Sequence, residues 1–458
     1  MFKKIKKIHF VGIGGIGMSG IAEVLLNLGY QVSGSDLQGS IITHRLKKLG
    51  AKIYIGHKES NLKNSHVVVT STAVASENPE VLKARELNIP IIPRAEMLAE
   101  LMRMKYGIAI SGTHGKTTTT SLIATVLVHA GLDPTAVVGG RVRGMGSNAK
   151  LGRGDILVAE ADESDKSFLK LSPAISVVTN IELEHTDHYK DLQEIIDCFV
   201  EFLNKVPFYG VVIACVDDKN VKSILPLLKR KYVTYGIESL ADYSASNIKF
   251  NGFKTSFDCL YQGKKLGVVT YHLGGAHNVL NVLATIAVAR ECDVAFKKIA
   301  AALKKFAGVE RRLQIKGEKN GVLVIDDYGH HPTEIKATLQ TCKKSLPGRR
   351  VITIFQPHRY TRTRDLYNEF LGAFNDTDML YMVDIYAASE KPIAGISSEK
   401  LVESLNKNGK QAIYVKDLHK LKKTLKSEVK KNDVVLTLGA GNIYKFGEEF
   451  LHELGVTE

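Results

Sequence analysis

One loop constrains this chain more than any other part of its sequence. An apolar run at residues 107–111 leads directly into a helical pattern that ends near Ala130, through the loop Gly112-Thr113-His114-Gly115-Lys116-Thr117-Thr118. In such a loop the backbone amides surround phosphate groups, the lysine neutralises β- and γ-phosphate charge, and the next hydroxyl binds Mg²⁺. Residue 110 is Ile rather than Gly, so the loop is shorter than the common P-loop. The sequence therefore predicts a nucleoside triphosphate site between a strand and a helix.

The rest of the sequence predicts an α/β fold. Short apolar segments alternate with amphipathic helical segments along nearly the whole chain of 458 residues. This alternation is typical of parallel sheets covered by helices, and the length favours about three domains. We expect domains at residues 1–106, 107–312 and 313–458, with the phosphate loop at the start of the central one.

A second glycine-rich loop lies near the N-terminus. Gly12-Ile13-Gly14-Gly15-Ile16-Gly17 follows an expected strand and precedes an expected helix, and Asp36 ends the next strand. Glycines in this pattern let a pyrophosphate approach the helix N-terminus, and a carboxylate at the second strand commonly binds ribose hydroxyls. A dinucleotide and a UDP-sugar share these groups, so both remain open, as does a purely structural turn.

Acidic side chains follow two strands beyond the phosphate loop. Glu160 ends the expected strand at residues 156–159, and the run 180–188 follows the strand at 175–179. Ligands of open α/β sheets gather at the carboxyl ends of strands, where an oxygen can complete a Mg²⁺ shell. A single acidic cluster is more often solvated surface or a helix cap. Two such clusters beside a phosphate loop favour cation binding, with a second ion assisting phosphoryl transfer.

The last third of the chain places further polar runs at strand ends. Residues 326–332 follow one expected strand, and residues 356–364 follow another. Arg359 and Arg362 lie three residues apart at an expected helix start, where they can share a face and bind a carboxylate or phosphate. The alternative is a solvated basic turn.

Charge, cysteine content and hydropathy narrow the class of protein. The net charge of +14 comes from lysines spread along the chain, which permits acidic substrates without indicating nucleic acid. Five cysteines without a C-x-x-C pair argue against a disulfide scaffold or a zinc site and fit a reducing cytoplasm. No apolar run approaches the ~20 residues that a membrane span needs. We therefore expect a cytoplasmic monomer or homodimer without nucleic acid or stable membrane association.

These motifs resemble those of the Mur ligases, and the resemblance covers essentially the whole chain. The matching segments are Gly12–Ala22, Gly112–Thr118, Asp327–His331 and Phe355–Arg362, in this order. The resemblance implies an N-terminal Rossmann-like UDP-binding domain, a central P-loop-type ATPase domain with a mostly parallel sheet, and a C-terminal Rossmann-like domain. It also implies that ATP converts the carboxylate of UDP-N-acetylmuramate into an acyl phosphate, which L-alanine then attacks.

The resemblance further implies roles for individual residues. The implied ATP contacts are Gly112, Thr113, His114, Gly115, Lys116, Thr117, Thr118, Asn278, Asn281, Arg312 and Asp327. The implied UDP contacts are Gly14, Gly15, Ile16, Gly17, Ser35, Asp36, Ser71 and Thr72. Thr117 and Glu160 would bind one Mg²⁺, and His185 a second. Lys116 is the implied catalytic cation, and His330, Arg359 and Arg362 match positions near the incoming amino acid.

Three other functions remain open at this stage. A sister ligase that adds a recycled murein peptide to the same nucleotide would differ only in its amine pocket. An NAD-dependent oxidoreductase would use the first glycine loop but leave the loop Gly112–Thr118 and Glu160 without a role. A nucleotide-binding switch would bind ATP without turnover.

Several Mur ligases carry a carbamylated lysine in the central domain. Lys205 is nearby in this sequence, but its alignment with that lysine is left open.

Overall fold

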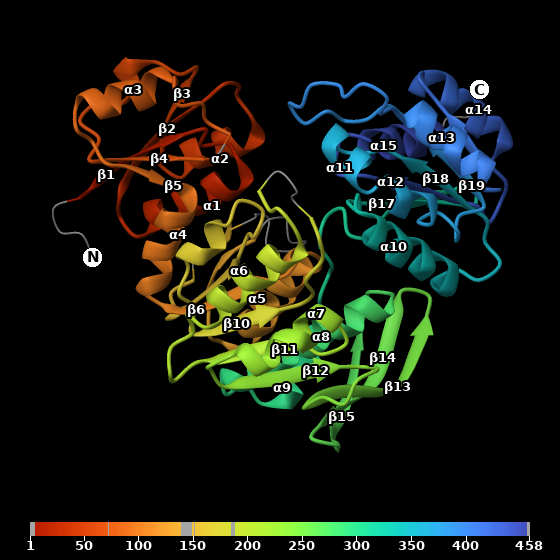
Figure 1. Ribbon diagram of the computed structural model, residues 1–458, viewed down its shortest axis with the longest axis horizontal. Coiled ribbons are helices and arrows are strands. Elements are labelled where there is room, and N and C mark those ends of the chain that lie inside the picture. The colour runs from red at the N-terminus through yellow and green to blue at the C-terminus, as the bar shows by residue number, and fades with distance from the viewer. Residues whose placement is uncertain (1–4, 72, 139–148, 151, 185–187, 456–458) are drawn as a thin grey trace. The chain divides into compact units, whose positions relative to one another are not determined.

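The computed structural model describes residues 5–71, 73–138, 149–150, 152–184 and 188–455 (Figure 1). Thr72 and His185, two of the expected site residues, lie outside these ranges. The chain divides into two compact units. The first consists of residues 1–246, 259–267 and 280–307, and the second of residues 247–258, 268–279 and 308–458.

The first unit begins with a sheet of five parallel strands in the order β3-β2-β1-β4-β5 (Figure 1). The chain starts at β1 in the middle and winds outward in both directions, so the order of strands reverses beside β1. Ligands of such sheets bind outside the carboxyl ends of the strands at this point. The elements are β1 (Lys7–Val11), α1 (Ile16–Asn27), β2 (Gln31–Asp36), α2 (Ile41–Lys48), β3 (Lys52–Ile55), the 3₁₀ turn η1 (Glu59–Asn61), β4 (Val67–Thr70), α3 (Pro79–Glu86), β5 (Ile91–Pro93) and α4 (Arg94–Arg103).

The central sheet has the strand order β15-β14-β13-β12-β11-β10-β6-β9-β7-β8. β6 lies between β10 and β9 and is parallel to both, so the loops after these three strands meet at one edge. The strands are β6 (Tyr106–Ser111), β7 (Thr135–Val137), β8 (Ala149–Lys150), β9 (Ile156–Glu160), β10 (Ile175–Val178), β11 (Val211–Cys215), β12 (Tyr232–Gly236), β13 (Tyr243–Asn251), β14 (Lys254–Tyr261) and β15 (Lys264–Tyr271). The helices are α5 (Lys116–Ala130), η2 (Ser167–Lys170), α6 (Leu192–Leu203), α7 (Lys219–Ile224), η3 (Leu225–Leu227), α8 (Ala276–Glu291) and α9 (Phe296–Lys304).

The third sheet lies in the second unit and has the order β16-β17-β21-β18-β19-β20, with only β16 antiparallel to its neighbour. Its strands are β16 (Gln314–Lys319), β17 (Val322–Asp327), β18 (Val351–Phe355), β19 (Met379–Met382), β20 (Ala412–Tyr414) and β21 (Val434–Leu438). Its helices are α10 (Pro332–Ser345), α11 (Tyr360–Asp365), α12 (Tyr367–Leu371), α13 (Ser398–Lys407), α14 (Leu418–Glu428) and α15 (Tyr444–Glu453). The three sheets confirm the expected α/β class with mostly parallel strands.

The inner strands β17, β18 and β21 of the third sheet are buried on both faces. Val322 and Val324 belong to one hydrophobic cluster, whereas Leu323 and Ile325 belong to another. Successive side chains of a strand point to opposite faces, so a strand between two helix layers is apolar at every position. This is why these strands appear in the sequence as continuous apolar runs.

Two further observations concern the chain as a whole. None of the helices within the described ranges is long and apolar enough to cross a membrane. All five cysteines are free thiols.

Candidate active site

The phosphate loop joins β6 to α5. Gly112 and Gly115 have φ of +124° and +85°, a region that residues with a Cβ rarely adopt. Gly115 is the N-cap of α5, and no side chain in the described part of the chain caps this helix. The amide groups of its first turn are therefore available to an anion, which the helix dipole also favours.

Both glycines are packed too closely to carry a side chain. A Cβ at Gly112 would lie 2.1 Å from Oγ1 of Thr179, and one at Gly115 would lie 2.9 Å from Oδ1 of Asn281. Because these neighbours are themselves buried, the loop keeps its shape only while both positions remain glycine.

Residues after β10 hold the loop from one side. Asn180 accepts hydrogen bonds from the main-chain N–H of His114 through its side chain (2.8 Å) and from that of Thr113 through its main-chain oxygen (3.1 Å). Oγ1 of Thr179 donates to the main-chain oxygen of His114 (2.6 Å). The sequence predicts no individual role for Thr179 or for Asn180. The available signal is their position directly after an apolar strand.

Lys116 is folded back into the loop. Its Nζ donates to the main-chain oxygen of Gly112 (2.5 Å) and to Oε1 of Glu163 (2.8 Å), which is 3% exposed. Burial lowers the pKa of Lys116, but the carboxylates of Glu163, Asp162 and Glu160 outweigh it and raise that pKa. Burial raises the pKa of Glu163 to about 7, although Lys116 opposes this change. The ammonium group is thus charged and held by contacts that a phosphate can replace. Sequence reasoning did not distinguish Glu163 from the other acids of its run.

Oxygen ligands suited to Mg²⁺ flank the loop. Thr117 is the second residue of α5. Glu160 is the last residue of β9 and pairs with Ile110 of β6 in the strand register. Hydroxyl and carboxylate oxygens are the donors that Mg²⁺ prefers. Thr117 and Glu160 therefore fit the predicted cation in their chemistry and in their place at one sheet edge.

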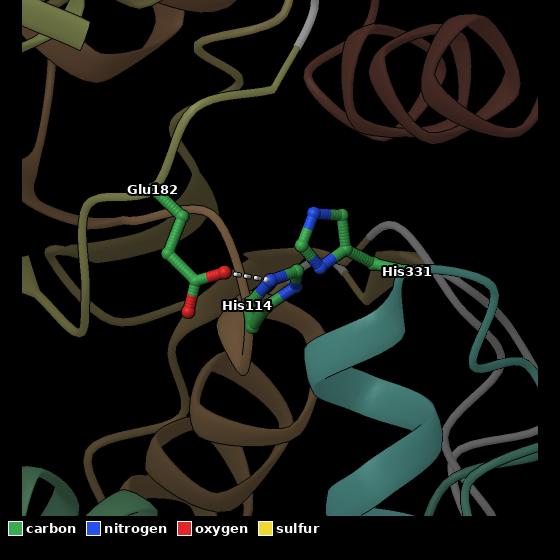
Figure 2. Close-up of side chains that lie close together, drawn as sticks. All are labelled: His114, Glu182 and His331. Atoms are coloured by element: carbon green, nitrogen blue, oxygen red, sulfur yellow. Dashed lines mark ion pairs between the residues drawn. The ribbon is translucent and has the colours of Figure 1, made fainter. Parts of the chain in front are cut away.

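A histidine–glutamate pair forms part of the same edge. Nε2 of His114 lies 3.4 Å from Oε2 of Glu182 (Figure 2). The main-chain N–H of Glu182 donates to Oγ1 of Thr113 at 2.9 Å. These contacts fix the segment after β10 against the loop and bring a further carboxylate to it.

The N-terminal glycine loop is held by the end of β2. The main-chain N–H groups of Gly12 and Ile13 donate to the main-chain oxygen of Ser35, both at 2.9 Å. The N–H of Gly14 donates to Oδ2 of Asp36 at 2.8 Å, and a Cβ at Gly14 would lie 2.7 Å from that oxygen. Asp36 therefore holds the turn in shape as well as lying at the predicted ribose position.

The remaining predicted UDP residues lie around this loop. Gly15 is the N-cap of α1, Ile16 and Gly17 begin the helix, and no side chain among the described residues caps it. Ser71 follows β4, which pairs with β1. The hydroxyl of Ser35 is buried and contacts Glu80 and His57. The structure thus gathers these residues at the carboxyl ends of β1, β2 and β4.

The predicted adenine residues lie on α8, across which the boundary between the units passes. Asn278 is in the second unit, where its Nδ2 donates to the main-chain oxygen of Gly274 at 2.7 Å. Asn281 is in the first unit, where its Oδ1 accepts from Oγ1 of Thr119 at 3.1 Å. Asn281 therefore belongs with the phosphate loop.

In the second unit, Asp327 ends β17 and is held by main-chain groups. Its two carboxylate oxygens accept from the N–H groups of Leu313 and Gly329, each at 2.7 Å. Burial raises the pKa of Asp327 to about 6, whereas the nearby charge of Arg312 lowers it. Asp327 thus fixes the segment that carries Arg312.

Glu334 joins Arg312 to the histidines before α10. Its Oε1 accepts from Arg312 (3.4 Å), and its Oε2 accepts from the main-chain N–H groups of His330 (3.0 Å) and His331 (3.3 Å). His331 is the N-cap of α10 and stands at the start of that helix in Figure 2. Sequence reasoning missed Glu334, for which the signal is an acid three residues after an N-cap.

Arg359 and Arg362 lie at the start of α11 as predicted. Arg359 is the N-cap, with φ of +71°, and its Nε lies 3.5 Å from Oε1 of Glu390. Arg362 donates to the main-chain oxygen of His358 at 3.1 Å, and the rings of His358 and His330 are 5.7 Å apart. The second unit therefore brings His330 and Arg362 together through His358.

Sequence profiles for the domains of one family match most of the chain. The profile for "Mur ligase family, catalytic domain" matches residues 7–106, that for "Mur ligase middle domain" matches residues 110–289, and that for "Mur ligase, glutamate ligase domain" matches residues 311–441.

Comparison with individual proteins also finds members of the Mur ligase family. A UDP-N-acetylmuramate–L-alanine ligase of Trichlorobacter lovleyi is 58% identical over 456 residues, which is 99% of this chain and 100% of that protein. One of Geotalea daltonii is 58% identical over 99% of both chains. The crystal structure of UDP-N-acetylmuramate-alanine ligase from Thermotoga maritima superposes with a TM-score of 0.83 at 31% identity, covering 98% of each chain. A murein peptide ligase of Psychrobacter arcticus, at 24% identity and a TM-score of 0.72 over 99% of each chain, shares the fold.

Proposed function

The chain belongs to the Mur ligase family, and we propose that it joins L-alanine to the carboxylate of UDP-N-acetylmuramate at the expense of ATP, in the synthesis of peptidoglycan precursors. The observation that carries this proposal is the phosphate loop, with an uncapped helix N-terminus and the Lys116 ammonium held beside it. Full-length relatives at 54–58% identity carry the same ligase name, which favours L-alanine over a recycled peptide as the amine.

The residues of the loop have defined tasks in this reaction. The amides of the first turn of α5 bind phosphate oxygens, and Lys116 neutralises the charge that develops as the γ-phosphoryl group moves to the carboxylate. Thr117 and Glu160 would hold Mg²⁺, which when bound neutralises further phosphate charge. The amine of L-alanine then attacks the carbonyl carbon of the acyl phosphate, the bond from carbon to the phosphate oxygen breaks, and phosphate leaves.

Several finer assignments are part of the same proposal. We propose domain boundaries at residues 1–106, 107–312 and 313–458, with UDP at the N-terminal glycine loop and L-alanine near His330, Arg359 and Arg362. We also propose two magnesium ions, a cytoplasmic location, and a monomer or homodimer without a nucleic-acid partner.

A phosphate-release assay tests the function directly. We expect release from ATP only when UDP-N-acetylmuramate and an amino acid are both present, with L-alanine giving the highest kcat/KM among the twenty. Release with the murein tripeptide but not with L-alanine would support the sister ligase instead. A change in nicotinamide absorbance without phosphate release would support an oxidoreductase, and ATP binding without release would support a switch.

We expect Asp36→Ala to weaken UDP-N-acetylmuramate and to spare ATP. The substitution removes the oxygen that accepts from the Gly14 N–H, so the glycine loop loses this hydrogen bond. The predicted contact with the ribose is lost as well. Losing a hydrogen bond to a charged group corresponds to a rise in KM of roughly 10-fold for UDP-N-acetylmuramate. The KM for ATP should change less than about 2-fold, and Glu86→Ala, at an exposed site on α3, should change neither value. Equal weakening of both substrates would contradict a separate UDP site.

A further inference from the structure

A buried carboxylate on a helix beside the N-terminal sheet has no part in the chemistry above. Glu80 lies in the first turn of α3 and is fully buried. Its Oε1 accepts from Nδ2 of Asn61 (2.6 Å) and from the main-chain N–H of Lys58 (3.2 Å). Its Oε2 lies 2.5 Å from Oγ of Ser35 and 3.3 Å from Nε2 of His9. Glu80 thus joins the middle of β1 and the end of β2 to the segment after β3.

The hydrogen bonds around Glu80 determine where the protons lie. Burial opposes ionisation of Glu80, but hydrogen bonds from His9, Ser35 and Asn61 lower its pKa to about 2. The group is therefore a carboxylate, which can only accept, and Ser35 must donate its one hydroxyl proton to it.

This arrangement selects one tautomer of His57. Nδ1 of His57 lies 2.8 Å from Oγ of Ser35 and 3.6 Å from Oε2 of Glu80. Since the Ser35 proton points to Glu80, Oγ of Ser35 can only accept from His57, so Nδ1 of His57 carries a proton. In a neutral imidazole the other nitrogen, Nε2, then holds a lone pair and is an acceptor.

The contact with Ser35 places the imidazole of His57 beside the end of β2, where the nucleotide site is predicted. His57 follows β3, whose register pairs Tyr54 with Ser35 and Ile55 with Asp36. Its side chain is 16% exposed, and within the ranges that the structure describes its Nε2 has no hydrogen-bond partner. One oxygen of Asp36 is already bonded to Gly14. A second acceptor at the end of β2 therefore complements Asp36 where ribose hydroxyls are expected.

We propose that Nε2 of His57 accepts a hydrogen bond from a ribose hydroxyl of the UDP-substrate, and that Glu80 is a positioning residue that holds the imidazole in the required tautomer through Ser35. The inference rests on the proposed function and adds to it a residue that determines the specificity for ribose.

The test removes the hydroxyl and the imidazole in turn. Full-length wild-type and His57→Phe enzymes are compared with UDP-N-acetylmuramate and its 2′-deoxy and 3′-deoxy analogues, at saturating ATP and L-alanine. For the wild type we expect one analogue to lose about 3- to 10-fold in kcat/KM, mostly through KM, as for one hydrogen bond. In His57→Phe the same analogue should equal the full substrate.

Two further variants separate the hydrogen bond from packing. His57→Gln can place an amide oxygen near the position of Nε2 and should keep part of the discrimination against the deoxy analogue. His57→Asn has polar atoms only near the position of Nδ1, so it should lose the discrimination even if its contact with Ser35 remains. Glu80→Gln should raise the KM for UDP-N-acetylmuramate and leave that for ATP unchanged. Discrimination kept in His57→Gln but lost in His57→Asn indicates a contact with the substrate and not a structural role. These two variants also test the proposal if His57→Phe does not fold.

His66→Phe is the matched control. His66 is exposed and precedes β4, so it lies at the opposite edge of the same sheet, where its Nδ1 accepts from the main-chain N–H of Lys6 at 3.1 Å. This variant should discriminate as the wild type does. The proposal is overturned if neither deoxy analogue is disfavoured by the wild type, or if the discrimination persists in His57→Phe or is equal in the Gln and Asn variants. Absence of ligation by the wild type with the full substrate would instead refute the proposed function.

Discussion

Lys116→Ala abolishes ligation, by on the order of 10³-fold or more in kcat, while binding of UDP-N-acetylmuramate stays near normal. Lys116 is the only lysine or arginine among the seven residues of the phosphate loop, and the transferring phosphoryl group gathers negative charge there. Alanine leaves the amides of α5 in place, so some ATP binding remains although transfer fails. Phosphate release measures the loss, and calorimetry with UDP-N-acetylmuramate measures what is retained.

The fold should survive this substitution because Glu163 can become neutral. With Lys116 present, burial already raises the pKa of Glu163 to about 7, and removing the ammonium raises it further. A protonated carboxyl costs much less to bury than an unpaired carboxylate. Lys231→Ala, which removes an exposed lysine paired with Glu291, is the control and should ligate normally. Near-normal turnover in Lys116→Ala would refute the assignment of the loop.

The positions of the strands could be predicted from the sequence because parallel strands between helix layers are apolar throughout. The strand expected directly before Gly12 is observed as β1, and the strand expected before residues 326–332 is observed as β17. Their ends could not be predicted from hydropathy. β17 continues into Asp327, because the main-chain ladder pairs this acid with Leu438 whatever its side chain.

The first residue of helix α5 could not be predicted from hydropathy either. The expected loop extends to Thr118, whereas the observed helix already begins at Lys116. Gly115 adopts a left-handed conformation as the N-cap, and this lets the helix start directly after it and brings Lys116 into the first turn. Hydrophobic periodicity does not indicate where this helix begins, because its first turn contains Lys116 and three threonines and no large apolar side chain.

The partners of the site residues could not be predicted, because they depend on contacts between distant segments. Lys116 and Glu163 are 47 residues apart, and Ser35 and Glu80 are 45 apart. In the sequence Glu80 has the pattern of an ordinary acid in the first turn of a helix, typical of solvent exposure. Only the folded sheet shows that it is buried among the strands that carry the nucleotide loop.

Gly112→Ala should eliminate measurable ATP binding while sparing the UDP site. An alanine Cβ would lie 2.1 Å from Oγ1 of Thr179 and 3.0 Å from the main-chain nitrogen and oxygen of Asn180. Main-chain atoms cannot rotate away, so the loop must shift and its amides lose their common direction. Overpacking of this kind costs about 1–3 kcal/mol, and left-handed backbone adds about 1–2 kcal/mol. Calorimetry with ATP and with UDP-N-acetylmuramate, together with urea unfolding, measures the three effects.

Gly131→Ala separates the two causes, because it carries the backbone cost without the collision. Gly131 is the C-cap of α5 with φ of +89°, and a Cβ there would have no atom within 4 Å. It should therefore lose about 1 kcal/mol of unfolding free energy and bind ATP as the wild type does. If Gly112→Ala and Gly131→Ala bound ATP equally well, the close contact of Gly112 with Thr179 and Asn180 would not control the phosphate site. Loss of ATP binding in Gly112→Ala alone would show that the phosphate site depends on a loop packed against the end of β10 as well as on the charge of Lys116.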